Sequence, residues 1–123
     1  MAAAAPDGRF AGFFVFEREC QRAGIVVRMV TGDHVETARF ISRECGIWTS
    51  KHHLCMTGAE FRKMMAEEDL ESKKHKVARL RVLARSSPQD KQVLVKFLQE
   101  HQGQVVAATG DGTNDGQWIL ACK

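Results

Sequence analysis

The chain has 123 residues, of which 44% are apolar and 27% are charged, and its formal charge is +3. This length fits one domain, and the composition allows a hydrophobic core and excludes disorder throughout. The mild charge and the absence of tyrosine argue against a nucleic-acid-binding face, which needs clustered basic and aromatic residues.

The first 23 residues carry few structural signals. The longest uncharged apolar run covers residues 11–16, far fewer than the about 20 residues that a membrane-spanning helix needs. We therefore expect no membrane span, and a soluble chain or a soluble piece of a larger protein. Residues 13–23 could form a helix, although the consecutive apolar residues Phe13 to Phe16 fit the helical period poorly.

The first clear strand covers residues 24–30, a short apolar run rich in β-branched residues that ends in Thr-Gly-Asp. This pattern is typical of a buried parallel strand. A helix is expected to follow, with Asp33 and Glu36 forming a capping box and Gly46 ending it. One face of this helix is apolar and consists of Val35, Ala38, Ile41 and Cys45.

Residues 47–79 are polar and irregular, and we expect a connector. Residues 58–68 favour a short helix within it, and residues 67–76 favour a solvated segment. The sequence His-His-Leu-Cys at 52–55 lacks the second pair of ligands that a closed zinc site needs. The four cysteines form no Cys-x-x-Cys pair and no signal peptide is visible, so we expect free cytosolic thiols.

The last third of the chain predicts two strands and a helix. Residues 80–84 alternate enough for a strand. Ser87 as the cap, Pro88 in the first turn and Asp90 three residues after the cap predict a helix that Gly103 ends. Residues 104–109 have the same pattern as 24–30 and predict a second buried parallel strand.

This alternation of strands and helices predicts an α/β fold with a parallel sheet. Ligands of such sheets bind beyond the carboxyl ends of the strands. Two of the predicted strands end in the same triplet, Thr-Gly-Asp, at 31–33 and at 109–111, and a third ends in Arg-Ser-Ser at 85–87. We expect these three ends to border one crevice.

The groups at these ends have the chemistry of a phosphoryl site. Thr31 offers a hydroxyl, Gly32 lets backbone N–H groups approach an anion, and the helix that begins near Asp33 adds its positive end. Lys91 supplies a point positive charge in the first turn of its helix. Each feature alone has a simpler interpretation, because Thr-Gly-Asp often caps a helix and a single lysine is often solvated.

The end of the strand 104–109 adds ligands suited to a metal ion. Asp111 and Asp115 are oxygen donors of the kind that Mg²⁺ selects, and Asn114 can donate to a phosphate oxygen. Taken alone, the five residues 111–115 also resemble part of a calcium loop, but they lack its remaining ligands and its terminal glutamate.

Three ordered stretches resemble the phosphorylation domain of P-type ATPases, most of all the calcium-transporting pumps of the plasma-membrane type. They are VRMVTGDHVETARFISRECGI (27–47), LRVLARSSPQDK (80–91) and VVAATGDGTNDG (105–116), and GAEFR (58–62) resembles the connector of the same pumps. The resemblance covers about residues 18–116. Residues 1–17 and 117–123 lie outside it as divergent edges.

The resemblance implies an incomplete Rossmann-like sheet of the haloacid-dehalogenase type, with ATP and Mg²⁺ as cofactors. It implies catalytic positions at Thr31, Gly32, Asp33 and Lys91. It implies nucleotide and phosphate contacts at Arg85, Thr109, Gly110 and Asn114. It implies magnesium ligands at Asp111 and Asp115.

The chain departs from the family at one decisive point. The family phosphorylates the aspartate of Asp-Lys-Thr-Gly-Thr, and none of the aspartates here begins that motif. We therefore expect a fragment of the cytosolic phosphorylation domain of an ATP-driven calcium pump, inactive by itself. The chain would take part in calcium transport only through a membrane domain that is absent here. The full-length relatives would lie in a membrane, whereas this chain alone would be soluble and cytoplasmic, with possible contacts to the rest of a pump.

Two alternatives remain. A soluble phosphatase of the haloacid-dehalogenase type would need a second aspartate two residues after the first, and Asp33 is followed by His34 and Val35. A non-catalytic regulatory or binding module would use only the domain surface. If the chain is a fragment, a sheet that lacks its first strand should expose an unpaired edge, so we expect marginal stability or aggregation.

Overall fold

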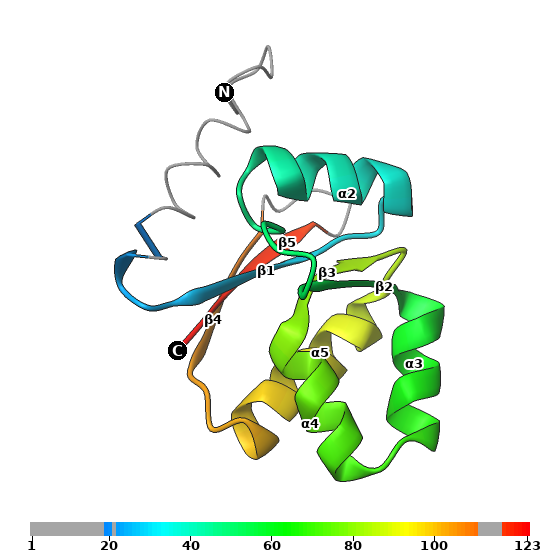
Figure 1. Ribbon diagram of the computed structural model, residues 1–123. Helices are drawn as coiled ribbons and strands as arrows, with labels where there is room; N and C mark the ends of the chain where they lie inside the picture. Colours follow the sequence, from blue (N-terminus) through cyan, green and yellow to red (C-terminus); the bar gives the residue numbers. More distant parts are fainter. Residues whose placement is uncertain (1–18, 21, 111–116) are drawn as a thin grey trace.

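The computed structural model describes residues 19, 20, 22–110 and 117–123, and the fold is mixed α/β (Figure 1). The elements, in chain order, are β1 (Val26–Val30), α2 (Val35–Glu44), β2 (Leu54–Thr57), α3 (Gly58–Glu67), α4 (Leu70–Arg79), β3 (Leu80–Ala84), α5 (Pro88–His101), β4 (Val106–Gly110) and β5 (Trp118–Cys122). Among the described residues, no helix has the length and apolar character needed to cross a bilayer.

The five strands form one open sheet in the order β2-β3-β1-β5-β4. β1 and β3 are parallel, as the sequence predicts, and the unpredicted strand β2 also runs parallel to β3. β5 is antiparallel to both of its neighbours. β1 and β4 therefore run parallel to each other with β5 between them. The prediction of an incomplete Rossmann-like sheet is confirmed, with the parallel strands extending from the edge strand β2 to the central strand β1.

The helices cover the two faces of this sheet unequally (Figure 1). Helix α2 lies on one face, and α3, α4 and α5 lie on the other. The larger core cluster packs between the sheet and these three helices and includes Phe61, Leu94, Leu98 and Leu120. A second cluster, which includes Met29 and Ile41, packs α2 against the opposite face.

Helix α2 begins one residue later than predicted. Its N-cap is His34, whose Nδ1 accepts from the N–H of Glu36, so the predicted capping box of Asp33 with Glu36 does not form. The N–H of Asp33 donates instead to the Thr31 hydroxyl oxygen, and Asp33 thus belongs to the preceding turn.

The end of α2 is as predicted. Gly46 has φ 77° and lies just beyond the C-cap residue Cys45. The N–H of Gly46 donates to the Arg43 carbonyl and that of Ile47 to the Ser42 carbonyl. These two bonds form a Schellman motif, which glycine permits because it adopts positive φ without a Cβ clash.

The region 47–79 is more regular than predicted. It contains strand β2, helix α3 and, where a solvated segment was expected, helix α4. Asp69 caps α4 by accepting from the N–H of Ser72, and only Val77 of this helix is buried. A single buried position gives almost no helical period, which explains why the sequence pattern missed it. No disulfide joins the four cysteines, all of which are described.

The end of the chain corrects two expectations. Residues 104–109 were expected to form a buried parallel strand, but β4 is an exposed edge strand that is antiparallel to β5. β5 lies in residues 117–123, which were expected only as a divergent tail, and it is mostly buried. The predicted helix at 13–23 lies largely outside the described residues.

One cation is buried inside the fold. Arg28 is 2% exposed, and its guanidinium donates to the carbonyls of Leu80 and Val77 at 2.9 and 3.1 Å. Burial lowers the pKa of Arg28, because the charged form loses its hydration. These bonds tie β1 to the junction of α4 and β3 and hold the centre of the sheet in register.

Candidate functional site

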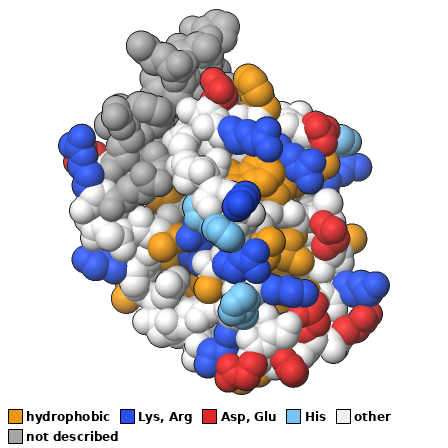
Figure 2. Space-filling view, viewed as in Figure 1, with side chains coloured by type: hydrophobic (Ala, Val, Ile, Leu, Met, Phe, Trp, Pro, Cys, Tyr) orange, Lys and Arg blue, Asp and Glu red, His pale blue; other side chains and the backbone are white. Residues whose placement is uncertain are grey.

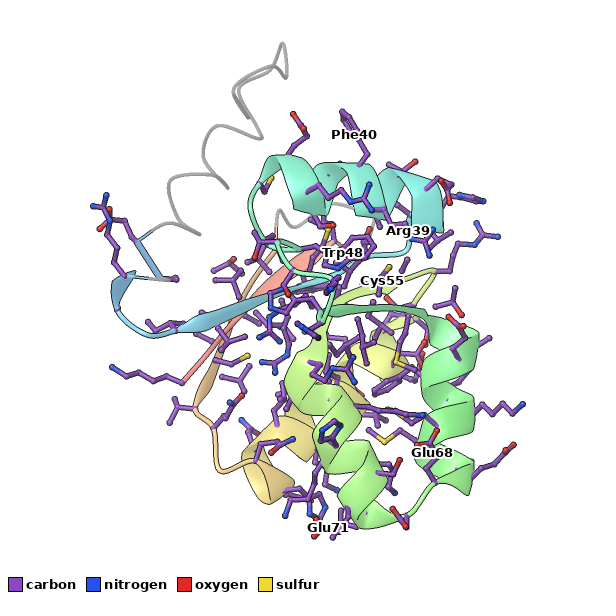
Figure 3. All side chains as sticks on the ribbon, in the orientation of Figure 1. Arg39, Phe40, Trp48, Cys55, Glu68 and Glu71 are labelled. Carbon is purple, nitrogen blue, oxygen red and sulfur yellow. The ribbon has the colours of Figure 1, made fainter. Side chains whose placement is uncertain are left out.

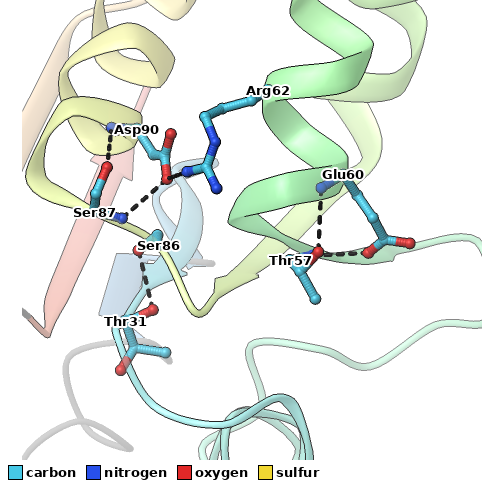
Figure 4. Close-up of polar contacts among 7 residues, drawn as sticks. All are labelled: Thr31, Thr57, Glu60, Arg62, Ser86, Ser87 and Asp90. Atoms are coloured by element: carbon cyan, nitrogen blue, oxygen red, sulfur yellow. Dashed lines mark hydrogen bonds and ion pairs between the residues drawn. The ribbon is translucent and has the colours of Figure 1, made fainter.

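The turn after β1 is fixed by backbone and hydroxyl bonds from the loop after β3. The N–H and the hydroxyl of Ser86 both donate to the Thr31 carbonyl, at 3.1 and 3.0 Å (Figure 4). The N–H of Arg85 donates to the Asp33 carbonyl at 3.0 Å. The ends of β1 and β3 are therefore in direct contact, as the parallel-sheet rule predicts.

Within this turn the predicted residues have different environments. Thr31 is buried, and its hydroxyl oxygen accepts from the Asp33 N–H at 3.1 Å. Gly32 is exposed. The Thr31 hydroxyl thus shapes the turn, and the exposed backbone at Gly32 is the part that an anion can approach.

Helix α5 is anchored at its first turn by a buried carboxylate (Figure 4). Asp90 completes a capping box with Ser87, and its Oδ2 accepts from the Ser87 N–H at 2.9 Å. The same oxygen lies 2.6 Å from Nη1 of Arg62, whose side chain is 57% exposed against 3% for Asp90. Gly58 lies so close that an added Cβ would be 2.7 Å from this carboxylate. These contacts fix the position of Lys91, the next residue.

Arg85 occupies an unusual backbone conformation. Its φ is 50°, the only positive φ of a non-glycine residue in the described part of the chain. Such a conformation costs about 1 kcal/mol or more and persists only where surrounding bonds enforce it. Here the bond from Arg85 N–H to Asp33 enforces it, and the Arg85 side chain stays exposed at the rim of the crevice.

Lys91 contacts an aromatic ring. Its Nζ lies 3.6 Å from the ring centroid of Trp118, close enough for a cation–π contact. Trp118 is the first residue of β5 and pairs with Val30 on one side and Gly110 on the other. The indole is thus placed between the ends of β1 and β4.

Glycine at position 110 makes room for this indole. A Cβ there would lie 2.7 Å from the Cε3 atom of Trp118. The neighbouring Thr109 donates from its hydroxyl to the Ile119 carbonyl at 3.5 Å, a long bond that still holds β4 against β5. Both predicted cofactor-binding residues of β4 therefore contact β5.

The space left in the crevice is small. Val30, Ser86, Ser87, Pro88, Lys91 and Trp118 line a cavity of about 30 Å³, which has room for a water molecule. Ser86 donates with its N–H and its hydroxyl to Thr31, and the Ser87 N–H donates to Asp90. The Ser87 hydroxyl and the Lys91 ammonium are the lining donors that suit an anion such as phosphate. The donor chemistry fits a phosphate, but the volume does not while Trp118 occupies the crevice.

The predicted magnesium ligands Asp111 and Asp115 and the predicted phosphate contact Asn114 are outside the described residues. Asp111, Asn114 and Asp115 all fall in 111–116, between β4 and β5. In the part of the chain that is described, no three His, Cys, Asp or Glu side chains gather as a metal site would require. His52, His53 and Cys55 are among the residues to which this finding applies.

The structure therefore brings the predicted residues Thr31, Gly32, Asp33 and Arg85 together in adjoining turns, with Lys91 close by. Sequence reasoning missed Trp118, which belongs to a segment with no motif. It also missed Arg62, although the resemblance of 58–62 to a pump connector marked its segment. Its role as the partner of Asp90 depends on a contact between α3 and α5 that no local pattern encodes.

The comparisons with known proteins give one consistent result. The chain is 51% identical over 108 residues to plasma membrane calcium-transporting ATPase 3 of Homo sapiens, and this match covers 80% of the chain. It is 54% identical over 98 residues to calcium-transporting ATPase 3, plasma membrane-type, of Oryza sativa subsp. japonica, and 51% identical over 107 residues to plasma membrane calcium-transporting ATPase 4 of Bos taurus. The chain spans 9% of the length of each of these relatives.

No protein-family model matches the chain. No solved structure matches it either.

Proposed function

This chain belongs, as a partial chain, to the plasma membrane calcium-transporting ATPases, and from that premise we propose that it is a portion of the cytosolic phosphorylation domain of such a pump. In that role it supplies contacts to phosphate, Mg²⁺ and nucleotide. It does not itself accept the phosphoryl group, because none of its aspartates begins Asp-Lys-Thr-Gly-Thr.

One observation carries this proposal. The turn at 31–33, the turn at 85–87 and Lys91 lie around one crevice at the carboxyl ends of parallel strands. Exposed backbone at Gly32 and the first turn of α5 offer N–H groups, and Lys91 offers a positive charge. This is the arrangement that stabilises charge on a phosphoryl group without covalent chemistry by the protein.

The remaining contacts follow the same assignment. Arg85, exposed at the rim, would contact the nucleotide, and Asn114 with Thr109 and Gly110 would border the phosphate. Asp111 and Asp115 would hold Mg²⁺, which supplies Lewis-acid stabilisation of phosphate charge when bound. Calcium transport would require the membrane portion of a whole pump, and the domain would face the cytosol.

Anion binding requires that Trp118 leave the crevice. With the indole in place, the cavity of about 30 Å³ is too small for phosphate, and Lys91 is engaged with the ring. Truncation of Trp118 should open the space and release Lys91. The substitution Trp118→Ala should therefore create a measurable phosphate site in a chain that otherwise binds phosphate weakly.

Titration of the isotope-labelled full chain with inorganic phosphate and Mg²⁺, followed by backbone amide NMR, tests this. In Trp118→Ala, shifts should concentrate at Gly32, Ser86 and Lys91, and the added variant Lys91→Met should abolish them. Lys96→Met, on an exposed position of the same helix, is the matched control and should leave them intact. Shifts spread over the surface, or insensitive to Lys91, would reject the phosphate site.

A second experiment tests whether the chain is inactive by itself. Incubation with γ-labelled ATP should give no acid-stable label that hydroxylamine removes. Labelling of that kind would mean that an aspartate in this chain acts as the nucleophile. Loss of the label in Asp33→Asn would then favour the phosphatase alternative.

A further inference from the structure

A strip of positive charge lies on the surface next to α2, away from the crevice. We define the basic strip as Arg39 and Arg43 of α2, Lys51, His52 and His53 of the loop 47–53, Arg79 at the end of α4, and Arg81 of β3. Figure 2 shows lysine, arginine and histidine side chains gathered on the face where Figure 1 has α2 above and α4 below.

Most of these cations have no acidic partner in the part of the chain that the structure describes. Arg39 pairs with Glu36 at 3.4 Å, whereas no carboxylate among the described residues lies within ion-pair distance of Arg43, Lys51, Arg79 or Arg81. Burial and the nearby charge of Arg28 lower the pKa of Arg81 to about 10. The strip is therefore electrostatically uncompensated and should attract an anion.

Burial and local positive charge both act on the neighbouring histidine. The pKa of His53 is lowered, first by burial and then by the charges of Arg81 and His52. His53 is therefore less inclined than an ordinary histidine to add another positive charge. Both it and Arg81 border the same hollow of the surface.

An aromatic residue stands in the middle of the strip. The guanidinium carbon of Arg43 lies 4.7 Å from the ring centroid of Trp48, and that of Arg39 lies 5.8 Å from it. Figure 3 places Arg39 and Trp48 together beside the sheet, whereas Phe40 points away from the opposite side of α2. An arginine stacked on an aromatic ring is held in position with its N–H groups free for a carboxylate.

The loop that carries Trp48 is tied down and hence preformed. Trp48 Nε1 donates to the His53 carbonyl at 3.2 Å, and the Thr49 N–H donates to His53 Nδ1 at 3.4 Å. Arg79 Nε donates to the His52 carbonyl at 2.8 Å, which fixes the loop to α4. A preformed surface loses little conformational entropy when it binds a partner.

Two hollows border this loop, and each combines positive charge with apolar surface. One, of about 310 Å³, is lined by Arg43, Trp48 and Lys51 among others. The other, also of about 310 Å³, has Arg81 and His53 beside the apolar Ile25, Val27 and Ile47. A ligand that fills both must present acidic groups and apolar groups along one extended line.

We propose that the basic strip binds an extended peptide segment of a partner protein in which acidic and apolar residues alternate. The acidic side chains pair with Arg43, Lys51 and Arg81, and an apolar side chain enters the hollow formed by Val27 and Ile47. Alternation along an extended chain suits two hollows that flank one loop. Concave, partly apolar hollows favour such a segment over the flat anionic surface of a membrane.

Titration of the labelled full chain with a short synthetic peptide of alternating Glu and Leu tests this proposal. The indole N–H resonance of Trp48 should shift in a saturable manner. The double variant Arg43→Glu, Lys51→Glu should weaken binding about tenfold, since it removes two exposed ion pairs and the charge reversal adds repulsion. Lys63→Glu, Lys96→Glu makes the same change in net charge at exposed positions and should bind like the unchanged chain.

Further arms make each result decisive. If the charge reversal impairs folding, as thermal melts would show, the neutral double variant Arg43→Gln, Lys51→Gln replaces it. This variant should also weaken binding of the peptide. A peptide in which Ser replaces Leu should bind more weakly. Equal binding by the strip variant and the control variant would overturn the proposal, as would equal binding of both peptides. Binding to vesicles containing phosphatidylserine without binding to the peptide would also overturn it and identify a membrane surface instead.

Discussion

The contact between Lys91 and Trp118 should contribute a measurable coupling energy to the stability of the fold. Replacement of Trp118 by Ala removes an indole that is mostly buried and packs against the core cluster. Full burial would make that cost about 3–5 kcal/mol, and the remaining exposure of Trp118 places it near the lower end, at about 3 kcal/mol. The cation–π contact at 3.6 Å, between partly desolvated groups, adds about 1 kcal/mol.

A double-mutant cycle separates these two contributions. The unfolding free energies of the unchanged chain, Trp118→Ala, Lys91→Met and the double variant are measured by urea denaturation with far-ultraviolet circular dichroism. The Lys91–Trp118 coupling should be about 1 kcal/mol. A control cycle with Lys96→Met instead of Lys91→Met should give a coupling near zero, because Lys96 is an exposed residue of the same helix. A Lys91 coupling below about 0.3 kcal/mol would refute the view that Trp118 holds this lysine.

Three other outcomes follow from the packing. Gly58→Ala should lower the unfolding free energy by about 1–3 kcal/mol in urea denaturation, since its Cβ would lie 2.7 Å from the Asp90 carboxylate; an unchanged midpoint would contradict this. Burial raises the pKa of the thiols of Cys55 and Cys122 in the folded chain. As the pH rises, the unfolded chain therefore loses these protons first, and the free energy of unfolding should fall above about pH 8.5. A flat profile of urea midpoints against pH would refute this. Ala107→Lys on the exposed edge of β4 should reduce aggregation seen by light scattering, and unchanged scattering at equal melting temperature would exclude this edge as the cause.

The parts of the fold that were predictable are those with local physical signals. β1 has apolar residues on both faces because the sheet is covered on both sides, and α5 has a capping box, a first-turn proline and a terminal glycine. The proximity of the turn at 31–33 to Ser86 followed from a general property of parallel strands, namely that their carboxyl ends meet at one edge.

The parts that were missed depend on long-range pairing. β4 looks like β1 in sequence, yet it became an exposed edge because β5, rather than a parallel neighbour, pairs with it. The short run Trp118–Cys122 is apolar enough for a strand or a buried helix segment, and only its fit between β1 and β4 decides between them. The filling of the crevice by Trp118 is a consequence of that same pairing, so no motif in the chain announces it.

The interior position of β5 sets an order for folding during synthesis. β5 follows every other described element in the chain, yet its neighbours on both sides are earlier strands. A ribosome must therefore release the segment through residue 122 before β4 can join the rest of the sheet. Until then β1 and β4 both have an open hydrogen-bonding side. Slow translation of the segment that carries β5 should therefore prolong the interval in which nascent chains are vulnerable to mispairing and need chaperones.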